Sequence, residues 1–399
     1  MLMADQIKEP EMSLKTWSAL VGLTLSAFIF NTSEFIPIAL LTDIGKDFGL
    51  TEAKAGMLIS VYAWVVMALS MPLMLMTSKM EMRKLLLGVI AVFTSFQVMS
   101  YLSTSFGMLM VSRIGVACAH SIFWSIVSII AVRIVPESHK SIALSMIVTG
   151  SSIAMILGLP LGRVIGLSVG WRMTFLSIGA VALFVLVYLF SLLPKVQSGG
   201  GMTAHDLPAM LRNKILIGIF LTTAAFATGY YTAYSYIEPF LQQIGRMSEN
   251  QITTTLMLFG FAGIIGSMLF SKYYPKFRFK FINITLIGLI VGVLLLRPVA
   301  SSIPVTIVVC ALIGMSATAF NVAMQSEIIT DTPQSQSSVA MSIFSGIFNF
   351  GIGTGALVGG MVCSHLSISF IGVVGGAIVT VAMVYWKFIV VKRSLRQAQ

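Results

Sequence analysis

Charge is scarce in this sequence. Of its 399 residues only 10% are Asp, Glu, Lys or Arg, whereas 57% are hydrophobic. A soluble domain of ordinary composition carries about 25% charged residues, so these few charges would not cover a globule of this size in water. The composition therefore excludes a soluble enzyme, a disordered chain and a disulfide-stabilised small domain. It is typical of a polytopic membrane protein whose outer surface faces lipid.

Cysteine and histidine are also rare. The three cysteines, Cys118, Cys310 and Cys363, lie inside apolar runs, and we expect them to be reduced, buried thiols. The four histidines lack metal-ligand spacing, so we expect neither a metal nor a cofactor. The sequence has no phosphate-binding loop, channel filter or nucleophile–base pair, which disfavours ATP coupling, a channel and an enzyme. The first apolar run has no signal-peptide cleavage site, and we expect it to be retained.

Apolar runs of membrane-spanning length predict twelve transmembrane helices. A bilayer core needs about 20 apolar residues per helix. The predicted spans are 17–41, 54–76, 83–103, 106–132, 140–163, 171–193, 215–241, 250–271, 281–299, 304–328, 337–363 and 366–391. The fold class is thus an all-α membrane protein.

Lysine and arginine are unevenly distributed between the two sides of these spans. If the N-terminus is cytoplasmic, the cytoplasmic segments carry about three times as many of the 25 Lys and Arg residues as the outer loops. This bias predicts that both termini are cytoplasmic. It also explains the net charge of +11 without a nucleic-acid partner.

The longest internal connection, residues 194–214, has six predicted spans on each side. It contains Ser198 followed by three glycines, a composition typical of a flexible linker. We interpret 1–193 and 215–399 as two six-helix bundles joined by this cytoplasmic linker.

The two halves show a weak internal repeat. Span 1 carries Glu34 and Pro37 near its outer end, and span 7 carries Glu238 and Pro239 at the matching place. Spans 5 and 11 are both rich in glycine, which allows helices to approach closely. A parallel repeat of this kind predicts a substrate site between the bundles near the midplane. The alternative is that glycine and proline are simply common in membrane helices.

Two charges lie at membrane depth. Glu34 in span 1 and Arg113 in span 4 each lie about seven residues from the outer end, or roughly 10 Å below the edge of the apolar zone. They could pair if the two spans adjoin. The functional interpretation is a proton-coupling carboxylate whose proton affinity changes when its contacts change. The alternative is a permanent ion pair that holds the bundle together.

Span 4 carries a polar and aromatic stripe at helical spacing, and we interpret it as facing a cavity. Its members are Arg113, Ala117, His120, Trp124 and Ser128. His120 falls near the midplane, where its protonation could matter. The alternative is an ordinary interhelical hydrogen bond.

Tyrosine, asparagine and histidine suit a polyhydroxylated ligand, since rings stack on its C–H faces and amides bond its hydroxyls. The further candidates for such a site are Asn31 in span 1, Tyr231, Tyr234 and Glu238 in span 7, Asn321 in span 10 and Asn349 in span 11. For the tyrosines the alternative is a belt at the membrane interface. For Asn349 it is a partner within the protein.

Several motifs carry a resemblance to the major facilitator superfamily, and within it to the drug/proton antiporter branch. The segment with Gly150, Gly158, Pro160 and Gly162 resembles the antiporter motif of span 5, although Arg163 stands where a second glycine is usual. Arg113-Ile-Gly resembles the motif of span 4. The loop at 77–84 occupies the place of the gating motif between spans 2 and 3, without its glycines and aspartate.

Longer strings resemble the bacterial sugar efflux transporters. They surround Glu34, Tyr62, Arg113, His120 with Trp124, the segment 231–240, and Asn349. The resemblance implies a proton-driven exporter of small sugars, such as arabinose-like sugars and thiogalactosides, in the bacterial inner membrane. We also expect the protein to be a monomer. It implies that Glu34, Arg113 and His120 couple protons, and that Tyr62, His120 and Trp124 belong to the sugar site.

Two other functions fit the residues. A multidrug/proton antiporter for cationic or apolar compounds would also use embedded carboxylates and aromatic rings. A membrane sensor or structural protein would have the same spans but would carry no substrate.

Overall fold

A computed structural model describes residues 12–77, 79–197, 213–332 and 337–392. Within these ranges, eleven helical segments are long and apolar enough to cross a membrane, which confirms the prediction of an all-α membrane protein. The helices are α1 (Leu14–Ala39), α2 (Leu41–Phe48), α3 (Glu52–Thr77), α4 (Met82–Tyr101), α5 (Phe106–Arg133), α6 (Lys140–Ile153), α7 (Leu159–Val169), α8 (Trp171–Leu192), α10 (Lys214–Tyr234), α11 (Ile237–Gln243), α12 (Glu249–Val299), α13 (Ile303–Thr330), α14 (Ser337–His365) and α15 (Ile371–Tyr385).

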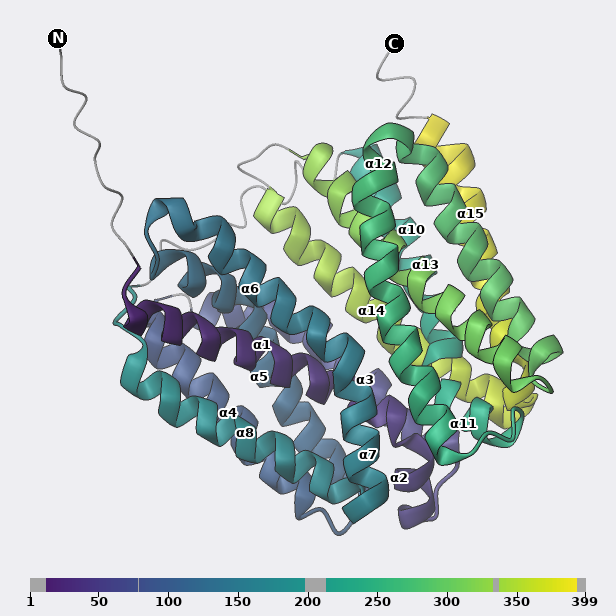
Figure 1. Ribbon diagram of the computed structural model, residues 1–399, viewed down its shortest axis with the longest axis horizontal. Coiled ribbons are helices and arrows are strands. Elements are labelled where there is room, and N and C mark those ends of the chain that lie inside the picture. The colour runs from purple at the N-terminus through teal and green to yellow at the C-terminus, as the bar shows by residue number, and fades with distance from the viewer. Residues whose placement is uncertain (1–11, 78, 198–212, 333–336, 393–399) are drawn as a thin grey trace.

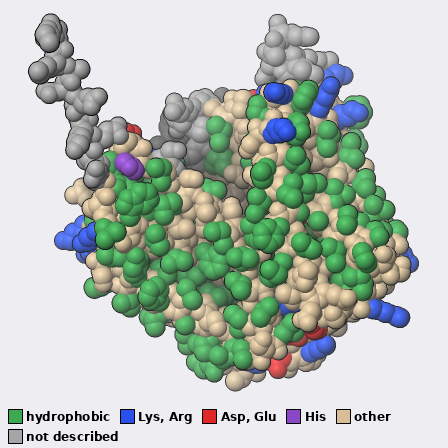
Figure 2. All heavy atoms as spheres, in the orientation of Figure 1, with side chains coloured by type: hydrophobic (Ala, Val, Ile, Leu, Met, Phe, Trp, Pro, Cys, Tyr) green, Lys and Arg blue, Asp and Glu red, His purple; other side chains and the backbone are tan. Residues whose placement is uncertain are grey.

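The flanks of the molecule are apolar. Figure 2 shows hydrophobic side chains over most of the visible face, with lysine and arginine near its edges. Large apolar side chains such as Phe190, Val308 and Val381 are each more than 60% exposed. Soluble proteins rarely expose apolar patches of this size, because apolar surface in water is unfavourable. This surface is therefore suited to contact with lipid.

The predicted loop between spans 8 and 9 is helical. α12 runs for 51 residues and includes both predicted spans, 250–271 and 281–299. Its backbone leaves helical geometry at Phe277, two residues after Pro275, and the two arms meet at this kink. Figure 1 shows the arms side by side in the C-terminal half, joined at the top of the view. The loop expected between residues 271 and 281 is therefore a sharp turn within one helix, since a proline can kink a helix without ending it.

The chain breaks near the outer ends of spans 1 and 7, and the sequence predicted neither break: the short helix α2 follows span 1, and the short helix α11 includes the last residues of the predicted span 215–241. α1 ends at Ala39 and α2 begins at Leu41, while α10 ends at Tyr234 and α11 begins at Ile237. Pro37 lies just before the first of these breaks and removes a main-chain donor there. The chain therefore bends at the same place in both halves.

Span 5 is longer than predicted and has an irregular middle. α6 leads through a π-helical turn, Ala154–Gly158, into α7, which continues to Val169. Gly170, with φ of +93°, ends the helix in a conformation that favours glycine. The π turn lies within the segment that resembles the antiporter motif. Single π turns in α-helices are frequent at functional sites.

Two clusters of buried apolar side chains form the core. One draws on residues between 19 and 196 and lies inside the N-terminal group of helices. The other lies mainly in the C-terminal group, but it also includes Phe35, Ile59 and Leu159 from the N-terminal half. The two groups of helices, here called the N-bundle (α1–α8) and the C-bundle (α10–α15), therefore pack against each other. The residues 198–212 of the predicted linker lie outside the described residues.

The bundles meet closely at the end that the charge bias predicts to be outside. A side chain added at Gly56, near the start of α3, would overlap the Tyr236 hydroxyl. The close contact continues to the middle of the same seam, where a side chain at Gly353 of α14 would overlap the Trp64 ring. Gln243 donates to the Glu52 carboxylate at 2.7 Å across the same seam. Figure 1 shows α2, α7 and α11 gathered at the bottom, whereas α6 and α14 diverge toward the top, where Figure 2 shows a recess. The described state is closed at its predicted outer end.

Candidate functional site

Glu34 lies on α1 at the boundary between the bundles. Its side chain is only 9% exposed, and its Oε2 atom lies 3.7 Å from His120 Nε2 on α5. That separation exceeds a hydrogen bond, so the two groups face each other without being locked together. A carboxylate at this depth needs a proton or a charged partner, which makes the position chemically unusual.

His120 connects this carboxylate to a tyrosine on α3. Its Nδ1 atom and the Tyr62 hydroxyl are 2.9 Å apart, and both side chains are buried. If the hydroxyl donates to Nδ1, the neutral ring presents its Nε2 proton to Glu34. Tyr62, His120 and Glu34 therefore form a line of three ionisable groups from three helices.

Arg113 lies beside Glu34 but does not contact its carboxylate. The guanidinium is fully buried and donates to Ser33 Oγ at 3.1 Å and to the main-chain oxygen of Glu34 at 3.4 Å. It also lies over the Tyr62 ring, 4.5 Å from its centroid. Spans 1 and 4 do adjoin, but the expected pair is replaced by bonds to the neighbouring serine and the backbone, because the Glu34 side chain turns toward His120.

Gln97 on α4 is part of this arrangement and was missed in the sequence. Its Nε2 donates to Ser33 Oγ at 2.5 Å, and the side chain is fully buried. Ser33 thus accepts from both Gln97 and Arg113. A lone amide in an apolar span was the signal that could have found it, as it was for Asn349.

The C-bundle faces this group with aromatic side chains. Tyr231 on α10 stacks on Phe35 of α1, with ring centroids 6.4 Å apart, and meets Phe348 of α14 edge-on at 6.1 Å. Phe35 directly follows Glu34, so the contact brings Tyr231 next to the buried acid. On the N-bundle side, Trp124 is half-buried one turn from His120, at 6.1 Å between ring centroids.

Asn349 has one unused hydrogen-bonding atom. Its Nδ2 donates to the Ser345 carbonyl of its own helix at 3.0 Å, while Oδ1 has no partner among the described residues. The side chain is only 7% exposed. A buried amide oxygen without a hydrogen bond costs free energy, and a ligand hydroxyl that donates to it would recover that cost.

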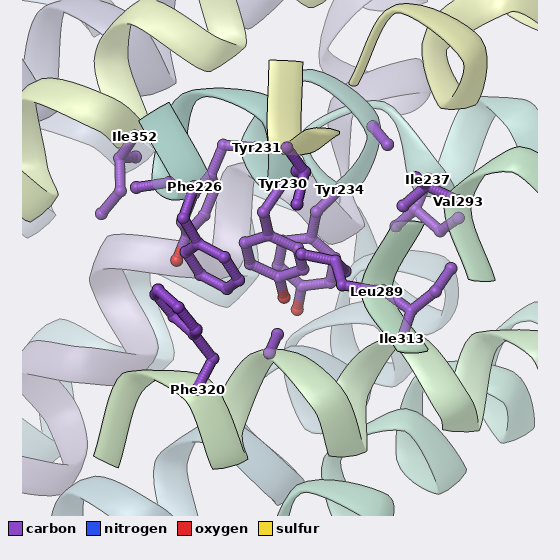
Figure 3. Close-up of a cluster of buried hydrophobic side chains, with 14 of the residues drawn as sticks. Phe226, Tyr230, Tyr231, Tyr234, Ile237, Leu289, Val293, Ile313, Phe320 and Ile352 are labelled. Atoms are coloured by element: carbon purple, nitrogen blue, oxygen red, sulfur yellow. The ribbon is translucent and has the colours of Figure 1, made fainter. Parts of the chain in front are cut away.

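Other predicted site residues bond elsewhere. Asn31 gives its amide to Ser151 of α6, and Asn321 accepts from Gln325 on its own helix at 2.5 Å. Tyr234 stacks within the C-bundle on Tyr230, at 5.1 Å between ring centroids. Figure 3 shows these two rings side by side, with their hydroxyls pointing the same way.

Glu238 lies at the closed outer end. It is fully buried, pairs with Arg163 at 3.1 Å and accepts from the Thr42 hydroxyl at 2.8 Å. These contacts join α11 of the C-bundle to α7 and α2 of the N-bundle. The structure thus places Glu238 in the contact between the bundles, with both carboxylate oxygens beside N-bundle groups.

The glycines of the antiporter-like segment hold span 5 against α1. Side chains at Gly150, Gly158 and Gly162 would overlap Thr24, Thr32 and Ile36, which follow one another along α1. Pro160 opens α7 at its second position, where a missing N–H costs little. The physical role of the motif in this chain is a close helix–helix seam that fixes the helix carrying Glu34.

The described ranges contain no group of three or more His, Cys, Asp or Glu side chains that could hold a metal ion. The site offers instead a buried acid, an imidazole, hydroxyls and aromatic faces at the seam between two helix bundles. This combination, within a fold of membrane-spanning helices in two groups, defines a membrane transporter that moves small molecules between its bundles.

The chain belongs to the Major Facilitator Superfamily, whose family profile matches residues 23–340. Solved structures share this fold at low sequence identity. A bacterial homologue of the human lysosomal transporter Spinster, inward-facing and unoccupied, superposes with a TM-score of 0.79 at 15% identity, covering 94% of this chain and 97% of that one. The human organic anion transporter MFSD10 gives 0.68 at 14% identity, covering 94% and 100%. A peptide transporter, POT, gives 0.75 at 12% identity, covering 92% and 93%.

Proposed function

We propose that this secondary transporter exports small sugars or sugar analogues from the cytoplasm in exchange for protons, as a monomer in a bacterial inner membrane. The proposal rests first on one observation: the buried Glu34 carboxylate faces His120, while the neighbouring Arg113 bonds Ser33 and not this carboxylate. The two bundles, divided at the predicted linker 194–214, would alternate in opening to either side.

The proton step follows from the line of Glu34, His120 and Tyr62. Glu34 can bind and release a proton because its carboxylate has no permanent ion pair that would keep it ionised. Arg113 is held by Ser33 and the backbone, close enough to reach the carboxylate after a small rearrangement of α1. A shift of this kind would favour loss of the proton, and the return shift would favour its uptake.

The sugar step is supported by the polar atoms left for a ligand. Asn349 Oδ1 would accept from a sugar hydroxyl, and the half-buried Trp124 ring would offer a face for the C–H side of a pyranose. The Tyr231 ring, which packs on Phe35 in this state, would do the same once the bundles separate. Together they agree with the resemblance of the surrounding strings to the sugar efflux transporters. The substrate would bind between α5 and the facing helices α10 and α14.

The test is transport by the purified chain in proteoliposomes. With an imposed pH gradient, we expect uphill movement of a radiolabelled thiogalactoside by the wild type. Glu34→Gln should lower uphill transport by about tenfold or more but retain downhill exchange of labelled for unlabelled sugar, because only the proton-carrying group is lost. Glu137→Gln, a change at an exposed cytoplasmic side chain, is the matched control.

Two results would contradict the proposal. Undiminished uphill transport by Glu34→Gln would remove this acid from the coupling step. Gradient-driven movement of a cationic dye with no movement of any sugar in the series would favour the multidrug antiporter, for which the aromatic walls of Phe35, Tyr231 and Phe348 are also suited.

A further inference from the structure

Arg163 on α7 is a buried charge at the closed outer end that contacts carboxylates of the opposite bundle. It is completely buried, and NH1 donates to the main-chain oxygen of Ala39 at 2.6 Å. The same nitrogen lies 3.1 Å from Glu238 Oε1, and NH2 contacts Glu249 Oε2. The guanidinium therefore holds one acceptor from its own bundle and two carboxylates from the other.

The carboxylates are themselves fixed. Glu238 also accepts from the main-chain N–H and the hydroxyl of Thr42, at 3.3 and 2.8 Å. Glu249 accepts from Gln242 at 3.0 Å and lies in the first turn of α12. The network thus connects α1, α2 and α7 of the N-bundle with α11 and α12 of the C-bundle.

The two seams of the outer end are built differently. Between α3 and α14, glycines allow apolar contact around Tyr236, which donates to Ala356 at 2.9 Å within its own bundle. Between α7 and α12, the contact is ionic and centres on one guanidinium. Arg163 occupies the position where the antiporter-like motif usually has glycine, so this charge is a property of the chain and is not required for close packing of the motif.

We propose that Arg163 keeps the outer end closed, and we call its contacts with Glu238 and Glu249 the latch. Opening toward the outside requires its guanidinium to leave Glu238 and Glu249 together, and in the opened state water would solvate all three charges. Removing one partner of a buried ion pair leaves the other charge buried and uncompensated, which destabilises that state. The latch therefore stabilises the closed outer end only while Arg163 and the two carboxylates are all present. The proposal needs two bundles that alternate, but neither a sugar nor a proton.

The experiment measures the opening directly. Spin labels at Ser168→Cys and Asn250→Cys, two exposed positions at the outer ends of α7 and α12, report the distance between the bundles by pulsed electron resonance in nanodiscs. The background replaces Cys118, Cys310 and Cys363 with alanine. We expect Arg163→Met to increase the population with separated outer ends by about tenfold or more, and Arg163→Lys to do so less.

A second variant and a matched control keep the result interpretable. The double change Glu238→Gln with Glu249→Gln removes the other half of the latch and should give the same shift, even if Arg163→Met does not fold. Arg172→Met removes an arginine at the same end whose partner, Asp47, is in its own bundle, and should leave the distances unchanged.

The latch would be overturned by unchanged distances in folded Arg163→Met and in the double variant, or by an equal shift in Arg172→Met. A wild-type chain that binds no sugar would contradict the proposed function and leave these distances unaffected.

Discussion

Single polar residues decide what this membrane protein can do, because each one buried at membrane depth must find a partner. His120 lies between Tyr62 and Glu34, and only its bond to the tyrosine, at 2.9 Å, is short enough to fix the ring. The orientation of the imidazole toward the acid is therefore set from the side opposite the acid.

Removing the Tyr62 hydroxyl tests this arrangement. Tyr62→Phe keeps the ring beneath Arg113 but releases His120 Nδ1, so we expect gradient-driven transport to fall about fivefold and its pH profile to change, in line with the loss of one buried hydrogen bond. Initial rates measured between pH 5.5 and 8.5 check this. Tyr188→Phe, at a partly exposed ring that stacks on Phe184, is the control, and equal effects of the two changes would argue against a special role for Tyr62.

Ser33 offers a second prediction at this scale. Its hydroxyl oxygen accepts from Gln97 and from Arg113, so Ser33→Ala leaves two buried donors, one of them charged, without their acceptor. We expect a loss of stability of about 2–3 kcal/mol. Ser26→Ala removes a buried hydroxyl that bonds only to its own helix and should cost less. Thermal unfolding in detergent compares the two, and similar costs would contradict the shared role of Ser33.

Elements on the predicted cytoplasmic side show how this chain replaces a missing motif. The loop before α4 lacks the glycines and aspartate of the usual gating motif, but Glu81 caps α4 by accepting from the N–H groups of Arg83 and Lys84. It also accepts from Val196 at 2.9 Å, and Met82 donates to the carbonyl of Val196. The first residues after α8 are thereby fixed to the loop.

The pKa of Glu81 gives this element a pH dependence. Desolvation acts to raise the pKa of Glu81, but the three main-chain donors outweigh it and hold that pKa below the ordinary value. A lowered pKa means that the carboxylate contributes stability above the usual Glu range, and that the contribution is lost as the pH falls through the lowered pKa.

Glu81→Gln should therefore lower stability by about 1 kcal/mol at pH 7, as for a weakened helix cap. The difference from the wild type should begin to shrink below about pH 4, where the unfolded chain takes up the proton, and should vanish once the pH has fallen through the lowered pKa of the folded protein. Thermal unfolding at several pH values measures it, with Glu137→Gln as the exposed control. A difference that stays constant down to acid pH would contradict the role of the charge.

At the scale of the whole molecule, the spans could be predicted from the sequence because lipid imposes length and apolarity on every one of them. Where prediction differed, the cause was local. Residues 272–280 were expected to be a loop between two spans, but they belong to one helix that turns sharply at Phe277, just after Pro275. The short helix α2 lies beyond the apolar run of span 1, and the break before α11 falls inside the predicted span 7, where length and hydropathy carry no information on a bend.

The site was predictable in its members more than in its pairings. Glu34 and His120 lie together, because ionisable groups at membrane depth face the protein interior, and Tyr62, which only the resemblance implied, lies beside them. Arg113 bonds Ser33, and Glu238 serves the outer closure, because pairing depends on side-chain direction and on the approach of the second bundle. Neither is encoded in residue spacing along one chain segment.

The glycine seam between α1 and span 5 has a mechanical consequence. Since Gly150, Gly158 and Gly162 leave no room for α1 to slide, the acid of α1 and the guanidinium of α7 belong to one rigid unit. Arg163 also donates a hydrogen bond to the main-chain oxygen of Ala39, the last residue of α1, which lies between one and two helical turns beyond Glu34. Whatever displaces the buried acid must therefore also pull on the charge that keeps the far end shut.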